Sequence, residues 1–193
     1  MRITAGYARG FLLACPNNGN TRPATDAARL AAFSSIGAAV EGARVLDLFA
    51  GTGAYGLEAA SRGAEEVMFV ERGAAAFKAL RANIEKVKKN APAIMKPVMA
   101  DCFSETIYGG KTFDLIFADP PYAMLADNDF TAKLLDLFAR RAAPGAWALL
   151  EAPAEFEPPE HSAARPLKRL GKKSKGKPTQ IIFGITPIEG QMP

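Results

Sequence analysis

Hydrophobic residues along this chain fall into short apolar runs that alternate with amphipathic stretches. Five runs predict β-strands: 45–49, 67–70, 94–100, 113–118 and 146–151. The stretches between them carry apolar residues at helical spacing and predict helices at 55–62, 74–89 and 130–141. A strand followed by a helix, repeated in this way, predicts parallel pairing with right-handed crossovers. We therefore expect an α/β protein with a doubly wound sheet.

The two ends of the chain depart from this alternation. Segments 2–5 and 11–14 flank a glycine-bounded turn, so residues 1–22 are predicted to form an N-terminal β-hairpin extension. Residues 23–193 then form one domain, beginning with a helix that Thr25 or Asp26 caps and that runs to about residue 39. Near the C-terminus, 167–170 and 180–185 flank a lysine-rich loop and predict antiparallel strands at one edge of the sheet.

Composition places the chain among ordinary globular domains. It has 193 residues, of which 49% are hydrophobic and 23% charged, which suits one domain with a real core. No apolar run is long enough to span a bilayer, and the N-terminus has no signal-peptide core. Two cysteines make no disulfide framework and one histidine makes a zinc site improbable. We expect a cytoplasmic monomer without a metal or a membrane contact.

Positive charge is modest in total, at +4, but unevenly placed. Arginines dominate the first forty residues, and from 161 to 188 the chain has basic residues but no acid. Clustered cations are typical of a surface that contacts a phosphate backbone. The candidate contacts are Arg2, Arg9, Arg22, Lys172, Lys173, Lys175 and Lys177. The alternative interpretation of the lysine-rich loop is a solvated surface.

A glycine motif lies between the first strand and the following helix, as nucleotide-binding loops do. Gly51, Gly53 and Gly56 have the spacing that lets a backbone approach a ligand at a helix N-terminus. The next two strands end in Glu71 and Asp101, where the ribose hydroxyls and the base of a bound ligand are expected. Ordinary acids at strand ends are the alternative interpretation of both residues.

Asp47 and Cys102 refine this interpretation. A carboxylate at Asp47, just before the glycine loop, repels a pyrophosphate but suits a sulfonium ligand with an ammonium group. This favours S-adenosylmethionine over a nicotinamide cofactor, although a buried, helix-capping acid is the alternative role. Cys102 follows Asp101 beside a strand end, where we interpret it as a pocket or packing residue.

The segment Asp119-Pro120-Pro121-Tyr122 follows the fourth strand and predicts the chemistry. An exocyclic base amine is a poor nucleophile. It becomes more reactive when the Asp119 carboxylate and the Pro120 carbonyl accept hydrogen bonds from its two N–H groups. The two prolines stiffen the turn, and Tyr122 can stack on the base, which must be unpaired or flipped out. The alternative is an ordinary β-turn.

With these residues placed, the chain resembles the RsmD-like family of 16S ribosomal RNA guanine-N2 methyltransferases. The resemblance rests on the glycine and Asp-Pro-Pro-Tyr motifs and on the more particular segments 9–10, 22–26, 45–53 and 69–72. It implies a Rossmann-like class I methyltransferase with a seven-stranded, mostly parallel sheet and an N-terminal hairpin that helps bind RNA. It also implies S-adenosylmethionine at Asp47, Gly51, Gly53, Glu71 and Asp101, with 25–26 near its methionine end.

The function expected on this basis is methyl transfer from S-adenosylmethionine to the N2 amine of a guanine in small-subunit ribosomal RNA. The chain has no separate recognition domain, so we expect an assembling small ribosomal subunit to supply the shape that is recognised. Three alternatives stay open: a DNA adenine-N6 methyltransferase, a nicotinamide-dependent oxidoreductase and a non-catalytic RNA-binding module.

Overall fold

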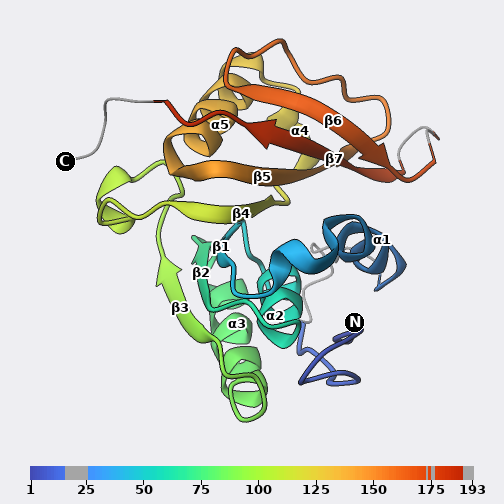
Figure 1. Ribbon diagram of the computed structural model, residues 1–193, viewed down its shortest axis with the longest axis vertical. Helices are drawn as coiled ribbons and strands as arrows, with labels where there is room; N and C mark the ends of the chain where they lie inside the picture. The colour runs from blue at the N-terminus through green and yellow to red at the C-terminus, as the bar shows by residue number, and fades with distance from the viewer. Residues whose placement is uncertain (16–25, 173, 175–176, 189–193) are drawn as a thin grey trace.

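A seven-stranded sheet with the order β3-β2-β1-β4-β5-β7-β6 runs through the computed structural model, which describes residues 1–15, 26–172, 174 and 177–188 (Figure 1). The strands are β1 Arg44–Leu48, β2 Glu66–Glu71, β3 Ile94–Met99, β4 Phe113–Ala118, β5 Ala142–Pro153, β6 Ala164–Leu170 and β7 Pro178–Ile185. The first five pair in parallel, whereas β7 is antiparallel to both β5 and β6. The predicted α/β class and the antiparallel edge are both confirmed.

The helices are α1 Asp26–Ile36, α2 Ala54–Ser61, α3 Ala74–Val87, α4 Tyr122–Leu125 and α5 Asn128–Arg141, with short 3-10 turns η1 Gly37–Val40 and η2 Glu105–Ile107. Helices α2, α3 and α5 lie between parallel strands as the periodicity indicates, whereas α1 precedes β1 and β3 leads to β4 through η2. The first helix is shorter than the sequence predicts, because it ends where Gly37 takes a left-handed φ of 60°. The one-turn helix α4 carries too little periodicity for a sequence-based prediction. None of the described helices is long and apolar enough to cross a membrane.

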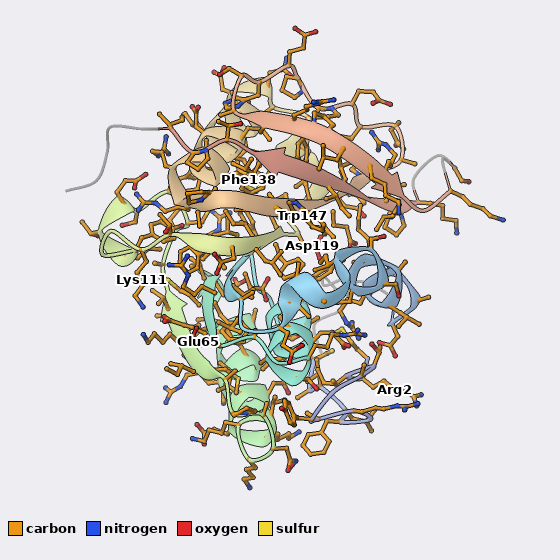
Figure 2. All side chains as sticks on the ribbon, viewed as in Figure 1. Arg2, Glu65, Lys111, Asp119, Phe138 and Trp147 are labelled. Atoms are coloured by element: carbon orange, nitrogen blue, oxygen red, sulfur yellow. The ribbon has the colours of Figure 1, made fainter. Side chains whose placement is uncertain are left out.

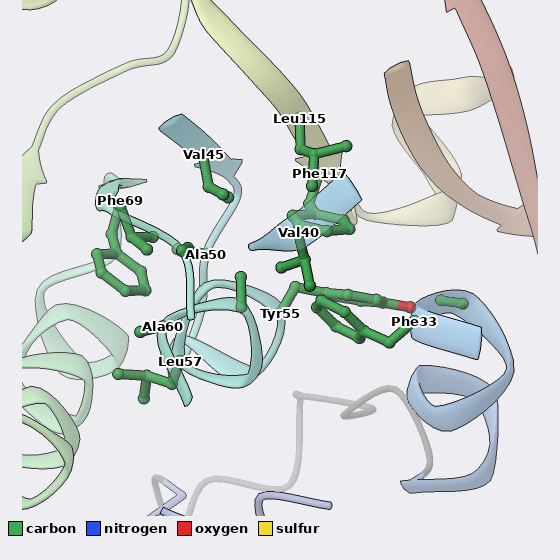
Figure 3. Close-up of a cluster of buried hydrophobic side chains, with 14 of the residues drawn as sticks. Phe33, Val40, Val45, Ala50, Tyr55, Leu57, Ala60, Phe69, Leu115 and Phe117 are labelled. Carbon is green, nitrogen blue, oxygen red and sulfur yellow. The ribbon is translucent and has the colours of Figure 1, made fainter. Parts of the chain in front are cut away.

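Each face of the sheet buries its own hydrophobic core, because neighbouring residues of a strand point to opposite faces. Leu115 and Phe117 of β4 pack with Phe33 of α1 and with helix α2, as Figure 3 shows. The alternate residue Ile116 faces the other side, where Phe138 of α5 contacts Phe183 of β7 at 6.4 Å between ring centroids. The central strands are therefore covered on both faces, and their residues at the carboxyl ends are held rigidly.

The N-terminal hairpin is reduced to one antiparallel bridge, Arg2 with Leu12, in the described part of the chain. The Ile3 amide donates to the Phe11 carbonyl at 3.0 Å across this turn. Gly6, at φ 79°, lies against α2 so closely that an added Cβ would stand 1.7 Å from the Ser61 carbonyl oxygen. The hairpin is thus docked on α2 and does not project freely.

A buried carboxylate on α2 anchors this docking. Glu58 is fully buried and accepts hydrogen bonds from the Thr4 amide at 2.8 Å and from the Arg62 side chain at 2.7 Å. Arg29 of α1, also fully buried, lies 3.8 Å from Glu58 and donates to the Arg2 carbonyl. Because a buried charge needs partners, these bonds tie the hairpin, α1 and α2 together.

Candidate active site

A cavity of about 680 Å³ opens at the carboxyl ends of the parallel strands, where open α/β sheets bind ligands. Predicted site residues from five segments meet in its wall. They are Asp47, Gly51, Glu71, Asp101, Cys102, Asp119, Pro120, Pro121 and Tyr122. Figure 2 shows Asp119 in the interior, between the upper strands and the helices below. Met1 and Cys15 also line the cavity, so the docked N-terminal segment forms part of its wall.

The glycine loop connects β1 to α2, and its three glycines differ in what they face. Gly51, at φ 57°, lines the cavity, and an added Cβ there would meet only the Phe49 carbonyl oxygen at 3.9 Å. A Cβ on Gly53 would stand 2.5 Å from Leu80, and one on Gly56 would stand 2.3 Å from Phe69. Of the three glycines expected to approach the cofactor, only Gly51 lies in the cavity wall. The other two let α2 pack closely on α3 and β2.

Asp47 caps the first turn of α2 and also lines the cavity. Its Oδ2 accepts a hydrogen bond from the Gly56 amide at 2.8 Å in the first turn of α2, and the side chain lines the cavity. Burial raises its pKa to about 8, the Gly56 amide opposes the rise, and the charge of Glu71 adds to it. A cationic group in the cavity would therefore stabilise an ionised Asp47.

Glu71 ends β2 as predicted, and Asp101 lies two residues past the end of the neighbouring β3, but their surroundings differ. Glu71 is oriented by two amides: Gly51 donates to its Oε2 at 2.8 Å and Gly73 to its Oε1 at 2.6 Å. Asp101 has a half-exposed side chain, accepts from the Phe103 amide at 2.9 Å and lies 3.7 Å from Arg72. Glu71 is thus a fixed acceptor inside the cavity, and Asp101 lies at its rim.

The Asp119–Tyr122 turn follows β4 directly and leads into α4. The Pro121 carbonyl accepts from the Met124 amide at 2.8 Å, whereas no hydrogen bond in the described chain engages the Asp119 carboxyl or the Pro120 carbonyl. Burial, followed by the charges of Glu151 and Asp47, raises the pKa of Asp119 well above its ordinary value. Two acceptors are therefore open to a ligand at the tip of β4.

Sequence reasoning missed three residues beside this turn: Glu151, Tyr55 and Gln180. The Tyr55 hydroxyl donates to Glu151 Oε2 at 2.8 Å and accepts from Gln180 Nε2 at 3.0 Å, with all three side chains buried. Glu151 lies at the carboxyl end of a parallel strand, and the rule that singled out Glu71 applies to it equally. Gln180 carries no such signal, because its position depends on antiparallel pairing.

Some predicted cofactor residues have other surroundings. Asp26 does not line the cavity; it forms an ion pair with Arg29 at 2.8 Å and accepts from the Arg2 amide at 3.1 Å. Its neighbour Thr25 lies outside the described residues. Burial raises the pKa of the Cys102 thiol to about 12, with the Asp101 charge adding to it, so this residue packs as a neutral thiol.

The described basic candidates lie at the surface in two places. Arg2 and Arg9 are exposed on the N-terminal hairpin, and Figure 2 shows Arg2 at the periphery. Lys172 and Lys177 are exposed between β6 and β7, and the Lys177 carbonyl accepts from the Ala154 amide at 3.0 Å. Lys177 therefore lies next to the end of β5, at the edge of the sheet that carries the cavity. Arg22, Lys173 and Lys175 lie outside the described residues.

Metal ligands are not assembled anywhere in the described residues. No group of three or more His, Cys, Asp or Glu side chains among them is placed to hold an ion. The acids around the cavity come singly from separate strand ends, with backbone amides as the partners of Asp47, Glu71 and Asp101. The cavity thus offers acceptor oxygens for N–H and O–H groups of a ligand.

Curated relatives share a core segment with this chain. The Bacillus subtilis protein named "Putative rRNA methyltransferase YlbH" is 35% identical over 128 residues, which are 63% of this chain and 67% of that protein. "Ribosomal RNA small subunit methyltransferase D" of Escherichia coli is 33% identical over 122 residues, 63% of this chain and 60% of that protein. The alignment thus spans about two thirds or less of these relatives' lengths.

The fold agrees over nearly the whole chain. The solved structure "Putative methyltransferase yhhF" from Escherichia coli superposes with a TM-score of 0.78 at 26% identity, covering 96% of this chain and 97% of that one. The family model described as "Conserved hypothetical protein 95" matches residues 1–183. This chain therefore belongs to that family, which is the RsmD-like family that its motifs indicate, and it has the class I methyltransferase fold.

Proposed function

We propose that this protein transfers a methyl group from S-adenosylmethionine to the N2 amine of a guanine in small-subunit ribosomal RNA. One observation carries the proposal. The glycine loop, the fixed acceptor Glu71 and the open acceptors of the Asp119–Tyr122 turn face a single cavity at the strand ends. The names of the curated relatives, which are ribosomal RNA methyltransferases, support the substrate class.

The residues on the β1–β2 side of the cavity fit the cofactor. Gly51 leaves the cavity free of a side chain at the loop, and the Glu71 carboxylate, held by two amides, can accept hydrogen bonds from ribose hydroxyls. Asp101 lies where the adenine base is expected, and Asp47 is a buried acid that a cationic ligand would ionise. When bound, S-adenosylmethionine supplies a methyl group already activated by a sulfonium.

The residues after β4 handle the amine. The Asp119 carboxylate and the Pro120 carbonyl accept its two N–H groups, which localises the nitrogen lone pair, and Tyr122 contributes a ring for stacking. Asp119 can take a proton as the nitrogen gains its new bond. Because the methyl group is already activated, positioning and electrostatics account for the rest of the catalysis.

RNA is expected to lie across the cavity opening. Lys177 borders the sheet edge that carries the cavity and Lys172 is exposed at the end of β6, while the hairpin with Arg2 and Arg9 contributes a second basic surface. Arg22, Lys173 and Lys175 complete the proposed set by sequence. We further propose that the monomer acts on an assembling small subunit, whose shape supplies the recognition that this small chain lacks.

Mapping of methylated nucleotides tests the proposal. Ribosomal RNA from cells lacking the protein should lose one N2-methylguanine by mass spectrometry, and the wild-type gene should restore it. Asp119→Ala should not restore it, while the purified variant should still bind S-adenosylmethionine. The exposed acid Asp129, replaced by alanine, is the matched control and should restore the methyl group.

Other outcomes would decide for the alternatives. Loss of N6-methyladenine from DNA in the deleted strain, with ribosomal RNA unchanged, would identify a DNA methyltransferase. Binding of a nicotinamide nucleotide in place of S-adenosylmethionine would identify an oxidoreductase. Unchanged methylation by Asp119→Ala would show that this residue is not catalytic.

A further inference from the structure

A row of polar side chains crosses three neighbouring strands beside the cavity. Ala118, the last residue of β4, is in register with Leu150 of β5, and Asp119 and Glu151 directly follow this pair. Burial raises the pKa of Asp119, and the charge of Glu151 adds to this rise. Glu151 is in turn the register partner of Gln180 on β7. Register partners point to the same face on strands about 4.8 Å apart. The carboxyl of Glu151 therefore lies next to that of Asp119.

Hydrogen bonds orient the Glu151 carboxyl and define its role. A tyrosine hydroxyl has one proton, and that of Tyr55 is donated to Glu151 Oε2, while Gln180 Nε2 donates to the same hydroxyl. Glu151 is thus an acceptor at Oε2. Burial raises the pKa of Glu151, whereas hydrogen bonds from Tyr55 and Gln180 and the charge of Arg29 lower it. The side chain is only 3% exposed and lines the cavity.

Such an arrangement is costly for the fold, which points to a ligand. A buried carboxylate loses its hydration, and a second carboxylate beside it adds repulsion. The hydrogen bonds from Tyr55 and Gln180 and the charge of Arg29 offset only part of this cost, because burial still raises the pKa of Glu151. A ligand with adjacent N–H donors would satisfy both carboxyls at once and offset their repulsion.

We propose that Glu151 is a specificity-determining residue that accepts the N1–H of the target guanine while Asp119 and the Pro120 carbonyl accept its N2 amine. This inference rests on the proposed function. Guanine presents N1–H and the N2 amine as neighbouring donors on one edge, so it matches two neighbouring acceptors. Adenine and cytosine each present a ring-nitrogen acceptor beside their amine. This acceptor would face the Glu151 oxygen, so two acceptors would repel each other.

The test uses small subunits assembled in vitro on RNA in which 2-aminopurine replaces the guanine located by mass spectrometry, with subunits assembled on unmodified RNA as the reference. This base keeps the N2 amine but carries a lone pair at N1 in place of the N–H. For the wild-type protein, kcat/KM should fall about 10- to 100-fold on this substitution, because a hydrogen bond to a charged acceptor is lost. 2-Aminopurine also lacks the O6 carbonyl of guanine, so the comparison with Glu151→Gln is what assigns the effect to N1.

Glu151→Gln reverses the donor pattern with little change in shape. Its amide oxygen can still accept from Tyr55, and its NH₂ then faces the base. We expect kcat/KM on guanine to fall about 10- to 100-fold and the preference for guanine over 2-aminopurine to disappear or invert. Glu160, an exposed acid, is the matched control, and its glutamine variant should keep the wild-type preference.

The outcomes separate the inference from the function on which it rests. If wild-type protein methylates neither kind of assembled subunit, the proposed function is wrong. If it methylates guanine, but wild-type and Glu151→Gln discriminate against 2-aminopurine equally, Glu151 has only a structural role and the inference is wrong. Binding of S-adenosylmethionine by Glu151→Gln shows that the variant is folded, and Tyr55→Phe supplies a second variant that should weaken the preference by releasing the carboxyl.

Discussion

Replacing Asp47 by asparagine should remove a large part of the pH dependence of stability. The folded protein holds this carboxyl at a pKa of about 8, against an ordinary value of 3.8, mainly because it is buried. Between these two pH values the folded chain keeps a proton that the unfolded chain has released. Stability therefore falls as pH rises through this window, and the variant lacks this contribution.

The magnitude follows from the two pKa values. Each pH unit between them costs about 1.4 kcal/mol, so from pH 5 to pH 8 the Asp47 contribution falls by about 4 kcal/mol. The asparagine side chain of the variant would carry no charge at either pH and could still accept from the Gly56 amide through its oxygen. The variant should therefore be more stable than the wild-type protein at both pH values, and the margin should be larger at pH 8 than at pH 5.

Urea denaturation at both pH values measures this difference. The free energy of unfolding of wild-type protein should drop by about 4 kcal/mol more than that of Asp47→Asn over this interval. Asp129→Asn, at an exposed position, is the control and should follow the wild type. Equal pH slopes for Asp47→Asn and wild type would refute the idea that this carboxyl is protonated in the folded protein at neutral pH.

Three further predictions concern the hairpin, the acceptor and the loop. Gly6→Ala should lower the free energy of unfolding, measured by urea denaturation, by more than about 2 kcal/mol, because its Cβ would overlap the α2 backbone. Gly10→Ala is the control: Gly10 is also at positive φ but faces open space, so this change should lower it by only about 1 kcal/mol. The methylation rate should rise with pH and level off, because the pKa of Asp119 is raised and only its ionised form can take up a proton from the amine. A rate that falls with pH would contradict this. Replacing Lys172 and Lys177 by glutamine should flatten the plot of the logarithm of the RNA-binding constant against the logarithm of salt concentration, by about two units of slope at most. An unchanged slope would mean that these lysines are solvated surface.

Local patterns in the sequence determined most of the secondary structure. The apolar runs and the glycines that bound them correspond to the parallel strands and the long helices, because a strand covered on both faces must be apolar throughout. The acids at strand ends, Glu71 and Asp101, were also predictable, since parallel strands end at one edge of the sheet. Short elements such as α4 were not, because one turn has no periodicity to detect.

Tertiary structure decided what each residue faces. The sequence shows three glycines at nucleotide-loop spacing, but only packing on Leu80 and Phe69 reveals that Gly53 and Gly56 serve the fold and Gly51 the cavity. The sequence predicts Asp26 near the cofactor, but in the fold it forms an ion pair with Arg29. Such roles depend on neighbours that are distant along the chain and cannot be read from spacing.

The row formed by Asp119, Glu151 and Gln180 shows the same division most clearly. The first of these could be predicted as a site residue, because its Asp-Pro-Pro-Tyr context is local. The other two become site residues through the register of β5 with β4 and β7, and through a hydroxyl from α2. Register is set by side-chain packing across the whole sheet, so the second acceptor beside Asp119 exists only in the folded molecule.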